Sequence, residues 1–168
     1  MLLSVAPFFQ LHASPVIESQ VNEYGVKAAF IFNFIAFTHW PDSSDQELNL
    51  CIYGNDYFGQ EIDQLQKKPV NNSAIKTLRL TDIEKIEACQ VLFISKSAIG
   101  GLPAILKKIY NKPILTIADS QDAASQGVII NMMLIENKIK FEINLKSARD
   151  ADLQISSKLL QLATKVYQ

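Results

Sequence analysis

Residues 89–94 read CQVLFI, and residues 114–118 read ILTIA. Both runs are short and apolar and are bounded by polar or turn-forming residues, which is typical of strands buried on both faces. The segment from about residue 99 to residue 110 has a helical composition, although two glycines and a proline near its beginning delay its start. A buried strand, a helix and a second buried strand together predict a parallel pair joined by a crossover.

The same alternation extends toward the amino terminus. Residues 48–53 (LNLCIY) are predicted to form a strand, residues 56–66 a helix, and residues 74–80 a further strand. The repeated strand–helix order from residue 48 to residue 118 predicts an α/β fold, in which a mainly parallel central sheet carries helices on both faces.

Beyond residue 127 the pattern changes from parallel to antiparallel. Residues 128–135 are predicted to be a strand, Glu136 and Asn137 a turn, and residues 138–144 a strand that alternates strictly between apolar and polar side chains. This predicts a C-terminal antiparallel hairpin, followed by helices at about residues 146–151 and 156–166. The buried face should carry Ile139, Phe141 and Ile143, and the exposed face Lys138, Lys140 and Glu142.

The first long helix is predicted from Glu18 to about Phe37, and Trp40-Pro41 ends it. Its phenylalanine-rich part is too short and too interrupted to span a membrane, so a core helix is the favoured interpretation. Trp40 has two possible roles, because tryptophan is enriched both as a packing residue and in contacts with partners.

Residues 1–13 form an apolar, uncharged leader that ends at Ala13. We interpret it as a signal peptide whose true start lies upstream, because the usual basic segment is missing; a disordered apolar tail is the alternative. Residues 18–168 are then expected to form one domain.

Composition excludes several classes of protein. The chain has 168 residues, of which 48% are hydrophobic and 20% charged, with a net charge of −1; this argues against disorder and against nucleic acid as a main ligand. Two cysteines and two histidines are too few for a four-thiolate zinc site or a histidine-rich metal centre. We therefore expect no metal, no cofactor and no enzymatic activity.

Several blocks of sequence, in order between about residues 21 and 166, carry a resemblance to a known family. They are KAAFIFNF (27–34) with Trp40-Pro41, the strand with Cys51 and Tyr53-Gly54, CQVLFIS (89–95), ILTIAD (114–119), and FEINL (141–145) with Ala148, Leu153 and SSKLL (156–160). Each block alone is weak, but their order and spacing together resemble the YfiR-like family.

The resemblance implies a small regulatory protein exported to the periplasm. It would restrain a membrane-bound diguanylate cyclase by protein contact, and an OmpA-like outer-membrane lipoprotein would sequester it. The family also implies an α/β fold with a central sheet and a tendency to form homodimers. This chain departs in two respects: His39 stands where an acidic residue is common, and a second pair of cysteines found in some relatives is absent.

The implied compartment bears on Cys51 and Cys89, which lie at or near the starts of two predicted strands. An even number of cysteines in an exported protein is usually bridged, and the resemblance supports a bridge at these positions. Two buried free thiols on neighbouring strands are the alternative.

A crevice is expected where parallel strands end, and this gives a second hypothesis for function. The residues there are Gly54, Asn55, Ser95, Ser97 and Asp119. They could hold a small polar ligand as a periplasmic binding domain does, or they could be ordinary caps and turns. Catalysis by either serine would need a base, and the only histidine after the leader offers no reason to meet them.

Overall fold

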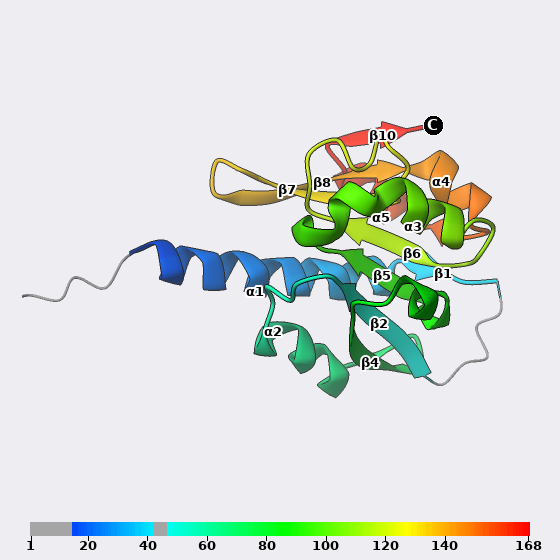
Figure 1. Cartoon of the computed structure of the whole chain (residues 1–168). Coiled ribbons are helices and arrows are strands. Elements are labelled where there is room, and N and C mark those ends of the chain that lie inside the picture. Colours follow the sequence, from blue (N-terminus) through cyan, green and yellow to red (C-terminus); the bar gives the residue numbers. More distant parts are fainter. Residues whose placement is uncertain (1–14, 42–46) are drawn as a thin grey trace, which may run out of the picture.

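An eight-stranded sheet forms the centre of the protein, with helices against both faces (Figure 1). The computed structural model describes residues 15–41 and 47–168, with side chains from residue 23 onward. In sheet order the strands are β10 (Lys165–Tyr167), β8 (Lys138–Asn144), β7 (Ile130–Ile135), β6 (Leu115–Ala118), β5 (Val91–Ile94), β2 (Glu47–Tyr53), β4 (Ser73–Leu80) and β3 (Pro69–Val70). The predicted α/β class is confirmed.

Parallel pairing dominates the sheet. Strand β2 pairs in parallel with β4 and β5, and β5 pairs in parallel with β6, so these four strands end at one common edge, called here the carboxyl edge. Strand β7 runs parallel to β6 over two residue pairs only and then returns antiparallel as β8. The predicted hairpin is therefore present, and four residues of β7 extend past the end of β6.

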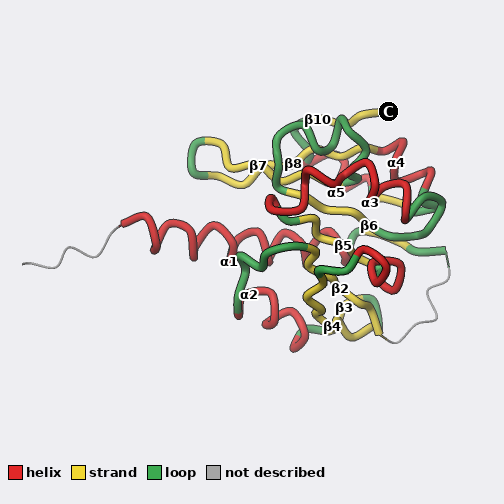
Figure 2. Tube along the Cα trace, viewed as in Figure 1, coloured by secondary structure: helices red, strands yellow, loops and turns green. Residues whose placement is uncertain are grey.

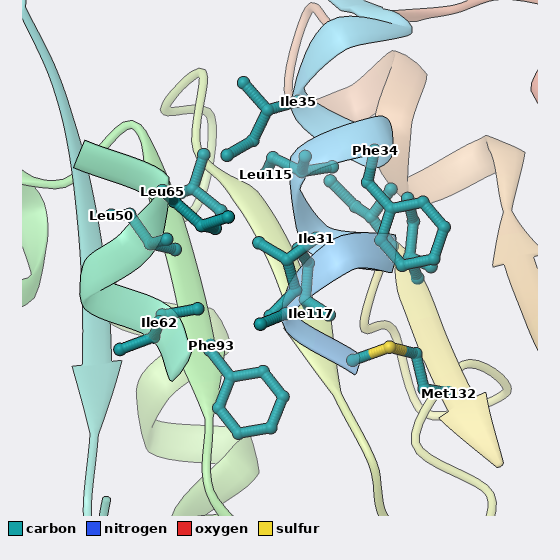
Figure 3. Close-up of a cluster of buried hydrophobic side chains, with 14 of the residues drawn as sticks. Ile31, Phe34, Ile35, Leu50, Ile62, Leu65, Phe93, Leu115, Ile117 and Met132 are labelled. Carbon is teal, nitrogen blue, oxygen red and sulfur yellow. The ribbon is translucent and has the colours of Figure 1, made fainter. Parts of the chain in front are cut away.

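Two helical layers cover the sheet, and the alternation of side chains along each strand explains why. One layer consists of α1 (Pro15–Ala36), α2 (Gln60–Asp63) and η1 (Gln64–Lys67), and the other of η2 (Ile83–Ala88), η3 (Lys96–Gly101) and α3 (Leu102–Lys108). In β5, Val91 and Phe93 belong to the core under α1, while Leu92 and Ile94 belong to the core under α3. Figure 3 shows the first core, in which Ile31, Phe34 and Ile35 of α1 pack with side chains of the sheet.

The C-terminal region differs from the sequence prediction. The predicted helix over residues 156–166 ends at Leu162 as α5 (Ser157–Leu162), and the chain then adds β10 beside β8 (Figure 2). The free edge of β8 explains the change, because its carbonyl at Phe141 accepts a hydrogen bond from the backbone N–H of Thr164 at 2.9 Å. Leu162, the last residue of α5, is 70% exposed.

The alternation of β8 is present with its predicted faces. Phe141 and Ile143 are buried and Lys138 is exposed, whereas Ile139 is only partly buried. Glu142 is half-buried because β10 lies beside it, and the phenol of Tyr167 donates a hydrogen bond to its carboxylate at 3.3 Å.

Three shorter elements complete the fold, and two predicted boundaries move. They are α4 (Leu145–Asp150), and β1 (Thr38–His39) with β9 (Gln154–Ile155), which form a separate antiparallel pair. The helix expected at residues 56–66 begins only at Gln60, because the Asp56 carboxylate accepts hydrogen bonds from the N–H groups of Phe58 and Gly59 and holds them in a turn. The α-helix expected near residue 99 begins late, at Leu102, as the two glycines and the proline predicted.

The phenylalanine-rich stretch lies in α1 as a core helix. Across residues 15–41 and 47–168, no helix has the length and apolar character needed to cross a membrane. The leader at residues 1–13 and residues 42–46 lie outside the described residues.

Candidate functional site

Four of the five predicted crevice residues meet at the carboxyl edge, where β2 and β5 end. The Ser97 hydroxyl accepts a hydrogen bond from the N–H of Asn55 at 2.8 Å and donates to the Ser95 hydroxyl at 3.4 Å. Gly54 has φ +99°, and a Cβ there would lie 2.7 Å from the Ser97 oxygen. Because these groups bond to one another, their contacts are those of caps and turns rather than of an open ligand site.

The fifth residue, Asp119, lies at the end of β6 and is almost completely buried. Its Oδ2 atom accepts hydrogen bonds from the Lys27 ammonium at 2.6 Å and from the Tyr24 phenol at 2.9 Å, both from α1. The Lys96 ammonium, half exposed, lies 3.8 Å from the same oxygen. Lys27 also forms an ion pair with Glu23 one turn earlier in α1. The carboxyl edge therefore holds a buried cluster of charged groups, defined by Glu23, Tyr24, Lys27, Lys96 and Asp119.

Electrostatics within this charged cluster favour the protonated phenol of Tyr24. Burial, the negative charge of Asp119 and the hydrogen bond to that carboxylate together raise the pKa of Tyr24 far above its ordinary value. The Lys27 ammonium lies 4.3 Å from the centre of the Tyr24 ring, a cation–π contact. The ring also packs edge-to-face on Phe58 and lies beside Tyr57. Tyr24 thus joins the ionic cluster to the apolar core.

Two oxygens at this edge have no hydrogen-bond partner among the described residues, namely Oδ1 of Asp119 and the hydroxyl of Ser120. Buried polar atoms are nearly always hydrogen-bonded, so this pair is the one feature here that fits a polar ligand or an internal water. Within the described part of the chain, no three histidine, cysteine, aspartate or glutamate side chains come together to hold a metal ion.

Sequence reasoning missed the role of Lys27. Asp119 was expected only as a crevice residue or an ordinary cap or turn, whereas it is buried and its closest charged partner lies 92 positions earlier in the chain. One signal was present: a lysine inside a helix that is apolar nearly all round has to be buried, and buried charges are almost always paired.

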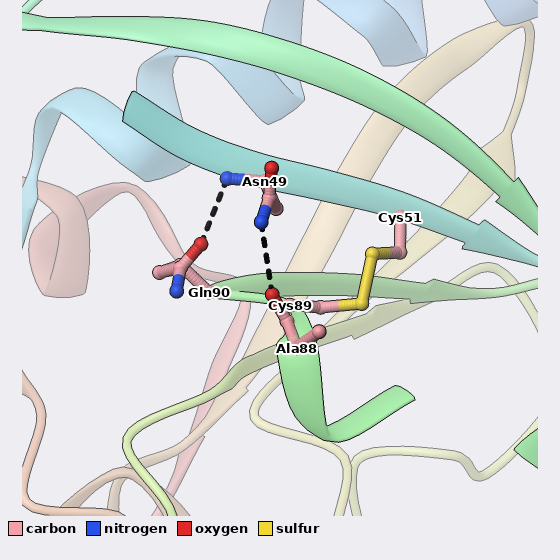
Figure 4. Close-up of a disulfide and its surroundings, with 5 residues drawn as sticks. All are labelled: Asn49, Cys51, Ala88, Cys89 and Gln90. Atoms are coloured by element: carbon pink, nitrogen blue, oxygen red, sulfur yellow. Dashed lines mark hydrogen bonds between the residues drawn. A yellow bond between two sulfur atoms is a disulfide. The ribbon is translucent and has the colours of Figure 1, made fainter. Parts of the chain in front are cut away.

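Cys51 and Cys89 form a disulfide, with Cα atoms 6.0 Å apart (Figure 4). It connects β2 to the residue that follows η2, and both cysteines are buried. Hydrogen bonds reinforce the same junction: the N–H of Asn49 donates to the Gln90 side chain at 2.8 Å, and the Asn49 amide donates to the carbonyl of Ala88 at 3.0 Å.

Trp40 lies shortly after the end of α1 and is partly buried. Its indole N–H donates to the carbonyl of Pro113 at 3.0 Å, and its ring packs against the core beneath α1. These contacts favour the packing role, and contact with a partner stays a prediction.

A pocket of about 170 Å³ opens away from the carboxyl edge, between α3 and α4. Leu106 and Ile109 line one side, Ser147 and Asp150 the other, and Thr116 lies in the lining between them. It includes none of the residues that the sequence singled out.

The fold and these sites define a single-domain α/β protein with a disulfide and a buried ionic cluster. The family model described as YfiR/HmsC-like matches residues 24–164, so the chain belongs to the YfiR/HmsC-like family. No curated protein matches the chain.

Two solved structures share the fold at low sequence identity. One is a conserved domain protein from Vibrio cholerae O1 biovar El Tor, with a TM-score of 0.53 and 10% identity over 85% of this chain and 60% of that one. The other is the ABC domain in complex with L-Trp from Streptococcus pneumonia, with a TM-score of 0.50 and 11% identity over 71% of this chain and 55% of that one. This chain therefore spans little more than half of either protein, and the likeness concerns the fold alone.

Proposed function

We propose that this protein is an exported, non-enzymatic regulator that restrains a membrane-bound diguanylate cyclase by contact from the periplasmic side. The observation that carries the proposal is the YfiR/HmsC-like match over residues 24–164. Family membership supports a periplasmic regulator of cyclic di-GMP signalling. Restraint of a cyclase, sequestration by an OmpA-like lipoprotein and homodimer formation are the specific parts of the proposal, and binding rather than turnover accounts for all three.

Two features of the structure agree with an exported regulator that acts by binding. The Cys51–Cys89 disulfide is of the kind that persists in an oxidising compartment such as the periplasm. The Ser97 hydroxyl accepts a hydrogen bond from the N–H of Asn55 and donates one to the Ser95 hydroxyl, and among the described residues neither serine has a histidine partner. Neither serine is activated as a nucleophile would be.

Deletion of the gene is the direct test. Loss of the regulator should raise cellular cyclic di-GMP and biofilm formation, and a copy directed to the periplasm by a known export signal should restore the low level. The same copy without an export signal should fail, because its partner surface lies across the membrane. Unchanged cyclic di-GMP, together with no membrane protein recovered by cross-linking in the periplasm, would remove the basis of the proposal.

A periplasmic small-ligand-binding domain is the second candidate. One observation favours it, namely the unpartnered Oδ1 of Asp119 and hydroxyl of Ser120 at the carboxyl edge. Against it, the Ser97 hydroxyl is already bonded to the N–H of Asn55 and to the Ser95 hydroxyl. A thermal-shift screen of small anions and amino acids distinguishes the two, because a ligand that prefers the native state raises the unfolding temperature.

A further inference from the structure

The β7–β8 hairpin projects from the carboxyl edge as the gold-coloured protrusion in Figure 1. The register with β6 ends at Asn131, so the last four residues of β7 have no β6 neighbour. At about 3.3 Å per residue, they carry the hairpin roughly 13 Å past the end of β6. Glu136 and Asn137 have φ values of 50° and 61°, which are the left-handed conformations that close a tight two-residue turn.

The tip of this hairpin, defined as residues 133–140, exposes apolar side chains on both faces. Leu134 is 48% exposed and Ile135 is 39% exposed. Neighbouring residues of a strand point to opposite faces of the sheet, so Leu134 and Ile135 cannot both lie at the edge of the core beneath α1. Ile139, directly across from Leu134, is also only partly buried. The domain covers neither face of the tip completely.

The charges at the tip are predominantly basic. Lys138 and Lys140 flank Ile139, and Glu136 is the single acidic residue of the tip. In the described part of the chain, neither lysine forms an ion pair, whereas Lys108, Lys112 and other surface lysines do. The tip therefore combines half-exposed aliphatic side chains with two unpaired ammonium groups.

We propose that the hairpin tip docks on an anionic phospholipid surface. Aliphatic side chains enter the boundary between head groups and acyl chains, while lysines beside them reach phosphates, because their stems are apolar and their ammonium groups remain solvated. A protein interface fits the tip less well, since a stable one buries about 800 Å² on each partner and two half-exposed aliphatic side chains offer far less. The inference does not depend on the proposed function, but such a contact would hold the domain close to a membrane-bound partner.

The test measures sedimentation of the exported protein, purified from the periplasm, with two kinds of vesicle. One kind is phosphatidylcholine alone, and the other is a mixture of phosphatidylcholine and phosphatidylglycerol. We expect binding to the anionic vesicles only, and loss of binding when ionic strength rises to about 1 M and the screening length falls to about 3 Å. Lys138→Gln with Lys140→Gln should lower the partition coefficient about 25-fold, or about fivefold for each basic residue near the surface.

A matched pair of variants tests the apolar part. Leu134→Ser with Ile135→Ser should lower binding to anionic vesicles at least tenfold, whereas Leu162→Ser, which alters an even more exposed leucine on α5, should leave it unchanged. Thermal unfolding of each variant checks that the fold is retained; if the double serine variant unfolds, Leu134→Ser alone replaces it.

Three outcomes would overturn the proposal. The first is equal binding of the protein to neutral and anionic vesicles, and the second is binding to anionic vesicles that survives both double variants. The third is that the protein binds no vesicles, while the hairpin variants differ from the parent in molecular mass. The last result, measured by light scattering, would instead identify the tip as a contact between two protein chains.

Discussion

The Lys27 ammonium lies 2.6 Å from Oδ2 of Asp119 and joins the middle of α1 to the end of β6. Both side chains are at most 2% exposed. A buried pair of this kind gives little net stability, because desolvation of the two charges offsets their attraction. The pair acts instead on the position of α1. Asp119, at the end of β6, is the carboxylate of the sheet that accepts a hydrogen bond from Lys27, so the pair favours one placement of α1 along the sheet.

Breaking the pair should be far more costly than removing it. Lys27→Met leaves Asp119 buried with only the half-exposed Lys96, 3.8 Å from its Oδ2 atom, as a counter-charge, and we expect a loss of about 3–5 kcal/mol in the free energy of unfolding. Lys27→Met combined with Asp119→Leu should recover part of this loss, because the fully buried carboxylate is then gone. The recovery is only partial because Glu23, 15% exposed, still loses Lys27 as its partner. Urea unfolding measures each value.

A surface pair serves as the control for that experiment. Lys76 lies 3.5 Å from Glu47, and both side chains are more than half exposed. Lys76→Met should therefore change stability by less than about 1 kcal/mol. If Lys27→Met were equally mild, the charged cluster would not be holding α1.

The disulfide gives a second prediction. It closes a loop of 38 residues, which the chain-entropy model values at about 4 kcal/mol. Cys51→Ser should lower the free energy of unfolding by approximately that amount, chiefly because the unfolded chain regains its freedom. Non-reducing peptide mapping of periplasmic material should show Cys51 joined to Cys89, and free thiols at both positions in that material would contradict the bridge.

Alkaline pH should weaken the attachment of α1 through Tyr24, whose pKa is raised by burial and by Asp119. Below about pH 10 the phenol is protonated in both states, and its contribution is fully present. As pH rises further, the unfolded phenol loses its proton while the folded one keeps it, so stability falls. The stability advantage of the parent over Tyr24→Phe should shrink by about 1 kcal/mol between about pH 9 and pH 11. An advantage that stayed constant over this range would show that Tyr24 titrates normally, and one that grew would show that folding lowers its pKa.

The sequence was sufficient for those elements whose local pattern and tertiary environment agree. Residues 91–94 and 115–118 are strands because every side chain in them suits a doubly buried position, and the alternation from residue 138 correctly placed Phe141 and Ile143 inside. The last helix shows the limit. Residues 163–166 continue a helical pattern in the sequence. In the structure, however, the free backbone groups at the edge of β8 pair with this part of the chain as a strand, and no pattern within these residues predicts that edge.

The site has the same limit in a sharper form. Gly54, Asn55, Ser95 and Ser97 were correctly expected near one another, because parallel strands end at one edge. What they do was not predictable from their types, since a serine hydroxyl serves a cap or a ligand equally well. The Lys27–Asp119 contact depends on how α1 lies across the sheet, which the sequence pattern alone does not determine.

The last prediction concerns the aromatic contact at the other end of α1. Phe141 of β8 is 4% exposed, and its ring centre lies 5.0 Å from that of Phe34 and 6.0 Å from that of Phe30. Phe141→Ala should therefore lower the free energy of unfolding by about 3–5 kcal/mol, since it removes the buried ring and with it the edge-to-face contacts that this ring makes with Phe30 and Phe34. Leu162→Ala is the control, because that side chain is 70% exposed and should change stability by less than about 1 kcal/mol. Urea unfolding of both variants compares the two, and equal effects would show that α1 does not pack on β8 as described.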